Sequence, residues 1–170
     1  MKDLDLIPDL IGPHLDVIFC GTAAGTRSAA VGAYYAGRGN RFWRVLHATH
    51  LTPRQFEPSE FRLLLEYRIG LTDIVKDQAG MDGQIKFHES GPKILSRKIR
   101  KFRPRFICFN GKQAAKVYFD RSNITYGLQD EHIGSTRIFV APSTSAAGNA
   151  YWDQAIWQDL ADLIRMQRFA

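Results

Sequence analysis

Three short apolar runs recur along the chain, and each ends in a turn of small or polar residues. The runs are Val17–Cys20, Phe106–Phe109 and Arg137–Ala141, and their length and composition predict buried strands. Segments whose apolar residues have helical spacing separate them. Strands and helices that alternate in this way predict a mostly parallel sheet between helices, with the three turns at one edge. Ligands of such folds bind at that edge.

The helical spacing predicts five helices. They cover Arg41–His50, Ser59–Tyr67, a segment from His88 or Ser90 to Phe102, Lys112–Phe119 and Tyr151–Gln167. Asn40 and Ser59 are the expected caps of the first two, because their side chains accept hydrogen bonds from free backbone N–H groups.

The remaining segments read as loops or short pieces. Residues 1–14 form an irregular lead-in, and residues 77–87 form a loop. The segment Gly21–Gly39 contains five glycines, and a loop of that length is expected to be functional or mobile. Gly70–Val75 is a short apolar piece with one carboxylate, Asp73. No repeat or linker is present, so residues 1–170 are expected to form a single domain.

Composition narrows the class of protein. An apolar share of 45% and a charged share of 24% are typical of a soluble globular domain. A net charge of +6 and a pI near 9.5 fit an anionic partner such as nucleic acid. No apolar run approaches the roughly 20 residues that cross a bilayer, and the N-terminus lacks a signal-peptide core. We therefore expect no membrane partner and a cytoplasmic location, or a nuclear one in a eukaryote.

Cysteine and histidine usage argues against a metal site. Cys20 and Cys108 both lie in apolar runs, which predicts buried free thiols. The five histidines are scattered and no Cys-x-x-Cys motif occurs, so no metal is expected.

Five motifs occur in an order that resembles one enzyme family. They are Gly21-x-x-x-Gly25, the stretch Tyr34-Tyr-Ala-Gly-Arg-Gly-Asn-Arg-Phe-Trp43, Phe109-Asn-Gly-Lys112, Tyr126-Gly-Leu-Gln129 and Pro142-Ser-Thr-Ser-Ala146. The chain resembles the thymine-DNA and mismatch-specific uracil-DNA glycosylases over roughly residues 15–168. These enzymes excise a deaminated or mispaired pyrimidine base from double-stranded DNA. The resemblance implies an α/β fold with three α/β/α layers around a four-stranded parallel sheet, and neither metal nor organic cofactor. A monomer is expected.

The resemblance also implies a base pocket. Tyr35 occupies the position where the family stacks an aromatic ring on the flipped base. Small residues in the first turn let backbone N–H groups hold the base and stabilise the anion that leaves. The base-binding residues implied are Gly21, Thr22, Ala24, Tyr35, Asp73 and Asn110. The alternative for Tyr35 is a core or loop-anchoring role.

A second implied set binds the DNA backbone. The turn from Pro142 to Ala146 matches the family's phosphate-gripping loop, and Lys112 matches a lysine near phosphate. The implied DNA-binding residues are Lys112, Ser143, Thr144, Ser145, Ala146, Ala147, Gly148 and Asn149. Local capping by the serines and a surface role for the lysine are the alternatives.

The first turn departs from the family pattern. The familiar form is Gly-Ile-Asn-Pro-Gly, in which asparagine positions the attacking water, but this chain has Ala23 at that place and Thr22 before it. Asp73 is the best substitute for the lost amide, because a carboxylate can orient water or stabilise positive charge on the sugar. The predicted catalytic set is thus Asp73, Ala23 and Thr22. Two other roles remain for Asp73, reading the base edge and capping its own helix.

A second departure follows Ala146, where the family inserts a bulky residue into the gap that the flipped base leaves. This chain has Ala147-Gly148-Asn149, so the wedge is weak or comes from elsewhere. Two other functions compete with excision. One is a DNA-binding protein that holds a flipped base without cleaving it, which the missing asparagine permits. The other is a flavodoxin-like binder of small molecules that uses the same glycine turn.

Overall fold

The computed structural model describes residues 4–169 and has one central sheet of five strands. The strands are β1 Val17–Gly21, β2 Ile69–Asp73, β3 Phe106–Asn110, β4 Gly127–Ile133 and β5 Thr136–Ala141, in the spatial order β2-β1-β3-β5-β4. Strands β2, β1, β3 and β5 are parallel, and β4 is antiparallel to β5. The predicted strands and the parallel sheet are confirmed.

The sheet has one strand more than the four that the resemblance implies. The additional strand, β4, has the sequence Gly-Leu-Gln-Asp-Glu-His-Ile and pairs with only β5 at the edge of the sheet. Most of its residues are exposed or half-buried, and most are polar, so the strand contains no apolar run. Sequence patterning that searches for apolar runs therefore misses this strand.

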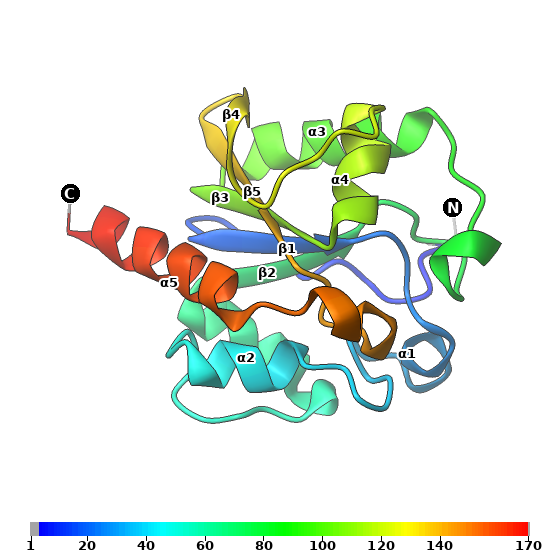
Figure 1. The fold of residues 1–170 in the computed structure, drawn as a ribbon, viewed down its shortest axis with the longest axis horizontal. Helices are drawn as coiled ribbons and strands as arrows, with labels where there is room; N and C mark the ends of the chain where they lie inside the picture. Colours follow the sequence, from blue (N-terminus) through cyan, green and yellow to red (C-terminus); the bar gives the residue numbers. More distant parts are fainter. Residues whose placement is uncertain (1–3, 170) are drawn as a thin grey trace.

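Helices cover both faces of the sheet, which gives three layers (Figure 1). The helices are α1 Thr26–Val31, α2 Phe42–Ala48, α3 Ser90–Phe102, α4 Lys112–Phe119 and α5 Gln154–Arg168, with 3-10 turns at Pro58–Tyr67, Asp82–Gln84 and Ala146–Tyr151. Helices α3 and α4 lie on one face, and α2 and α5 lie on the other. Side chains alternate between the faces. Phe19 packs against Phe42 and Trp157, whereas Ile18 and Phe109 belong to the opposite core.

Several predicted boundaries are wrong in informative ways. The segment Gly21–Gly39 is not one loop, because it contains α1. Ser59 does not cap the segment Pro58–Tyr67, which is a 3-10 helix preceded by Glu57. The Glu57 N–H donates to the Glu60 carboxylate at 2.9 Å. The last helix begins only at Gln154, because a 3-10 turn occupies the residues before it.

Other local predictions are confirmed in whole or in part. Arg41 rather than Asn40 directly precedes α2, but the Asn40 side-chain oxygen accepts a hydrogen bond from the Phe42 N–H at 3.0 Å and so satisfies a free N–H at the start of this helix. Cys20 and Cys108 are free and buried. In the described part of the chain, no helix is both long enough and apolar enough to span a membrane.

Candidate active site

A cavity of about 460 Å³ opens where the parallel strands end. The turn after β1, the last residues of β2 and β3, and the turn after β5 all contribute to its walls. Of the predicted site residues, it is lined by Gly21, Thr22, Ala23, Ala24, Tyr35, Asp73, Asn110, Lys112, Ser143, Thr144, Ser145, Ala146 and Ala147. Gly148 and Asn149 do not line it. The expectation that the three turns meet at one edge is confirmed.

Asp73 is a buried ionisable group in the wall of this cavity. It is the last residue of β2, lies in register with Gly21 of β1, and is only 6% exposed. A Cβ atom at residue 21 would lie 2.7 Å from the Asp73 Oδ1, so only glycine leaves room for this carboxyl group. Burial raises the pKa of Asp73 to about 7. Lys76 and the Gly21 backbone amide act against that rise, and Asp9 adds to it.

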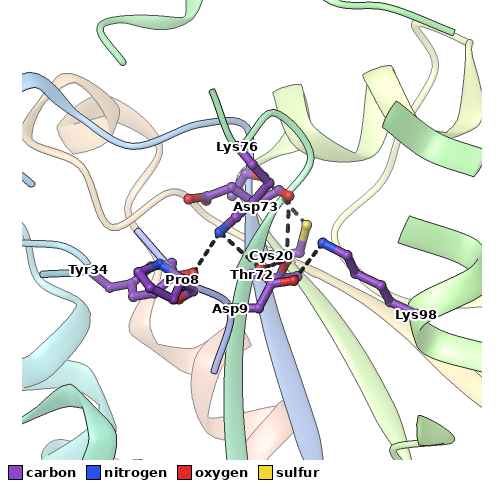
Figure 2. Close-up of polar contacts among 9 residues, drawn as sticks. Pro8, Asp9, Cys20, Tyr34, Thr72, Asp73, Lys76 and Lys98 are labelled. Carbon is purple, nitrogen blue, oxygen red and sulfur yellow. Dashed lines mark hydrogen bonds and ion pairs between the residues drawn. The ribbon is translucent and has the colours of Figure 1, made fainter. Parts of the chain in front are cut away.

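A network of charged and polar side chains lies beside Asp73 (Figure 2). The Lys76 ammonium is 2.9 Å from the Asp9 carboxylate and donates to the Tyr34 hydroxyl, also at 2.9 Å. The Thr72 hydroxyl donates to Asp9 at 2.7 Å, and Lys98 of α3 approaches the other Asp9 oxygen at 2.5 Å. The lead-in therefore forms part of the surroundings of the site.

Sequence reasoning missed this network. Asp9 and Lys98 are 89 positions apart, and no local periodicity reports such a pairing. The available signal was a lone carboxylate in the apolar stretch Leu6-Ile-Pro-Asp-Leu-Ile, since a charge among apolar residues needs a partner.

Tyr35 lies at the cavity with its ring packed against Phe42. The ring centroids are 4.0 Å apart and the planes are inclined by 30°. Its backbone has φ of 54°, which is strained for a bulky residue. Its hydroxyl is buried near the Asn110 side chain but makes no hydrogen bond of good geometry among the described residues, and burial raises its pKa well above the ordinary value. Tyr35 therefore carries a neutral hydroxyl group, and stacking on a base stays a prediction.

The turn after β1 is joined to the loop 77–87. The Thr22 hydroxyl donates to the Asp82 carboxylate at 2.6 Å, and the Gly80 N–H donates to the Ala24 carbonyl at 3.0 Å. Ala23 carries only a methyl group, so it offers no polar side chain to a water molecule. Two carboxyl groups lie close to this turn: Asp73, in register with Gly21 on the neighbouring strand, and Asp82, which is bonded to Thr22.

The turn after β5 is held by Asn110. The Asn110 amide nitrogen donates to the Thr144 hydroxyl at 2.9 Å, and its oxygen accepts from the Thr144 N–H at 3.0 Å. The Ser143 hydroxyl donates to Ser145 at 3.0 Å, and the Arg41 N–H donates to the Thr144 carbonyl at 2.8 Å. In this structure Asn110 thus positions the turn, and its predicted contact with a base remains a prediction.

Positive charge lies around the mouth of the cavity. Lys112 is the first residue of α4, and its ammonium group is 4.3 Å from the centre of the Tyr126 ring. Arg38 also lines the cavity. Within residues 4–169, no group of three or more His, Cys, Asp and Glu side chains is arranged to hold a metal ion.

Comparison with known proteins gives two findings. The family model described as the uracil DNA glycosylase superfamily matches residues 8–161. The fold is similar to a solution NMR structure from Methanosarcina acetivorans, described as a "putative Uracil DNA glycosylase", with a TM-score of 0.63. The two sequences are 22% identical over 94% of this chain and 96% of that chain, so this likeness establishes the fold alone.

Proposed function

The chain belongs to the uracil DNA glycosylase superfamily, whose members are DNA glycosylases, and on this basis we propose that it removes uracil from duplex DNA. It would hydrolyse the N-glycosidic bond of a base rotated out of the helix and leave an abasic site. Thymine and other deaminated bases are further proposed substrates, in line with the resemblance to thymine-DNA and mismatch-specific uracil-DNA glycosylases.

The observation that carries this proposal is the buried carboxyl group of Asp73 at the cavity. A cavity of about 460 Å³ is within the range of small-molecule sites, so it can enclose one nucleobase. The net charge of +6 and the lysine and arginine at its mouth favour an anionic polymer.

The proposed chemistry is dissociative. The bond between the sugar C1′ and the base nitrogen breaks, and its electron pair leaves with the base as an anion. The positive charge that develops on the sugar is stabilised by ionised Asp73, which also orients the water that attacks C1′. The proton released by that water passes to the carboxylate or to solvent. Backbone N–H groups of the turn after β1 stabilise the departing anion.

The enzyme is proposed to be monofunctional and to act as a monomer. Strand cleavage through a Schiff base needs a free amine at the sugar. Lys112 is the one lysine in the three turns, and its ammonium group lies over the Tyr126 ring. Phosphate contacts are assigned to Lys112 and to the turn from Ser143 to Ser145, whose hydroxyl and N–H groups suit phosphate oxygens.

Single-turnover excision from a uracil duplex tests the role of Asp73. We expect Asp73→Asn to lower the rate by about 100-fold or more, because the isosteric amide keeps the shape and removes the charge. Ala23→Asn restores a side chain that holds water, and we expect it to raise the rate. Undiminished cleavage by Asp73→Asn would end the assignment of this residue.

The pH dependence of the same rate tests whether Asp73 acts in its ionised form. A group that stabilises cationic sugar must be ionised, so the rate should rise with pH through about 7. A carboxylate that instead accepts a hydrogen bond from the base N3–H is also ionised and gives the same rise, whereas a fall in rate over this range would contradict both roles.

The second candidate function is a protein that binds a flipped base without excising it. The methyl group of Ala23 at the water-positioning place is the observation that favours it. Release of free base by the purified protein, scored on duplexes with uracil, thymine, hypoxanthine and xanthine, separates this function from catalysis.

A further inference from the structure

A base that leaves the double helix opens a gap in the stack, and proteins that stabilise such a gap insert an apolar side chain. The turn after β5 offers little for this purpose. Ala146 and Ala147 line the cavity with methyl groups, and Gly148 has no side chain. A Cβ atom added at Gly148 would meet Ser143 at 3.1 Å, so this place is closely packed as well as small.

Met81 lies at the same cavity and has the size that this turn lacks. Its side chain lines the cavity while the residue remains 68% exposed. Among residues 4–169, no other large hydrophobic residue is both exposed and part of the cavity wall. A thioether on an unbranched chain adapts to an irregular gap and offers a polarisable surface to neighbouring bases.

The loop that carries Met81 is hydrogen-bonded to the turn after β1, which lines the cavity. The Gly80 N–H donates to the Ala24 carbonyl at 3.0 Å, and the Asp82 carboxylate accepts from Thr22 at 2.6 Å. These bonds flank Met81 on both sides. The Met81 N–H donates to the Gln84 side-chain oxygen at 2.9 Å, and its carbonyl accepts from the Gln84 N–H at 2.8 Å. The Met81 side chain is thus exposed while hydrogen bonds hold the backbone around it in place.

We propose that Met81 is the wedge that enters the duplex and occupies the gap left by the everted base. The inference rests on the proposed function, because it concerns the same cavity and the same DNA. It assigns the filling of the opened stack to a loop outside the proposed catalytic set. An apolar wedge without hydrogen-bonding atoms reads no partner base, so a flat preference among opposite bases follows.

The chain contains a matched control for this residue. Met166 on α5 is also 68% exposed and does not line the cavity. Met81→Ala and Met166→Ala therefore remove the same exposed side chain at two places. Met81→Leu keeps an apolar side chain of similar size.

The test compares single-turnover excision of uracil paired with adenine and of uracil in the same strand unpaired. We expect Met81→Ala to slow excision from the duplex by about tenfold or more and from the single strand by no more than about twofold. Met81→Leu should stay within about threefold of the unaltered protein on both. Met166→Ala should change neither. An equal loss on both substrates, or no loss on the duplex, overturns the proposal.

A second measurement keeps the wedge separate from catalysis. A 2-aminopurine next to the target base brightens when the stack opens, whether or not the base is released. If the unaltered protein causes brightening and Met81→Ala does not, the result supports the wedge. If no base is released in the same experiment, the proposed excision is wrong but the wedge is not. Excision with equal brightening by both proteins retains the function and overturns the wedge.

Discussion

The pKa of Asp73 makes the stability of the protein depend on pH. The carboxyl group has a pKa near 3.8 in the unfolded chain and near 7 when it is buried. Between these values the unfolded chain releases the proton first, so the contribution of Asp73 to folding becomes less favourable as pH rises and is constant above about 7. A tenfold difference in acidity between the folded and unfolded chain corresponds to about 1.4 kcal/mol.

We therefore expect Asp73→Asn to be more stable than the unaltered protein at pH 8, by a few kcal/mol, with the difference vanishing towards pH 4. Chemical unfolding at both values measures it. The exposed Asp77→Asn variant is the control for the loss of one charge on the same segment. A difference that is equal at pH 4 and pH 8 would contradict the assigned pKa.

Gly21 is the residue that admits the Asp73 carboxyl group to the cavity. A methyl group there would approach Oδ1 to 2.7 Å, and either the carboxyl group or the strand must then shift. We expect Gly21→Ala to fold and to lose excision activity by about tenfold or more, because a displacement of about 1 Å suffices for such losses.

Gly12→Ala is the matched control for Gly21→Ala. The added methyl group meets only the Leu65 side chain, at 3.9 Å, and lies outside the cavity. Single-turnover rates for both variants, with circular dichroism to verify folding, check the prediction. Equal rates for both would show that the carboxyl group need not occupy its present position.

At the scale of elements, the contact between β3 and the turn after β5 fixes one wall of the cavity. Asn110→Ala removes two hydrogen bonds to Thr144, one of them to its backbone N–H. We expect the variant to lose about 1 to 3 kcal/mol of stability and to bind DNA more weakly, because the turn is no longer held. Denaturant unfolding and fluorescence anisotropy measure the two effects.

The exposed Asn123→Ala variant is the control for loss of an asparagine, and it should alter neither quantity. Loss of stability with unchanged affinity for DNA would mean that this turn does not contact the phosphates.

Elements that bury apolar residues could be predicted from the sequence. Elements that bury few apolar residues could not. The strand β1 and the strand β3 are fully or almost fully buried, and their apolar runs predict them directly. The strand β4 is stabilised by pairing with its neighbour rather than by its own composition. Helix α1 has six residues between glycine-rich turns, too few for a periodic pattern.

The candidate site likewise has features that the sequence predicts and features that it does not. The turns that end the parallel strands meet at one edge because of chain topology, so the sequence predicts which residues gather there. The roles of Asn110 and Thr22 depend on which polar atoms lie within hydrogen-bonding distance, and local sequence does not determine that. The contacts of Asp9 join the lead-in, β2 and α3, and depend on the complete fold.

At the scale of the whole molecule, an ion pair joins the beginning of β1 to the last turn of α5. The Asp16 carboxylate is 1% exposed and accepts from the Arg168 guanidinium at 2.8 and 2.6 Å, across 152 positions of sequence. Its other oxygen has no hydrogen bond among the described residues, and Arg105 lies 3.8 Å from it. The ion pair links α5 to the end of the sheet that lies away from the cavity.

Removing one partner should be more harmful than removing both. Arg168→Ala leaves a buried carboxylate with only the distant Arg105, and we expect a loss of about 3 kcal/mol in unfolding free energy. The double variant Asp16→Asn with Arg168→Ala removes the stranded charge as well, so it should lose less stability than Arg168→Ala alone and therefore less than the sum of the single changes. Urea unfolding of the full cycle measures the coupling, with the exposed Lys93→Ala as the control for loss of a cation. Strictly additive losses of unfolding free energy would contradict this prediction and show that the two ends of the fold are stabilised independently. We also expect uracil excision to be unchanged in every variant, because this pair stabilises the fold and not the site.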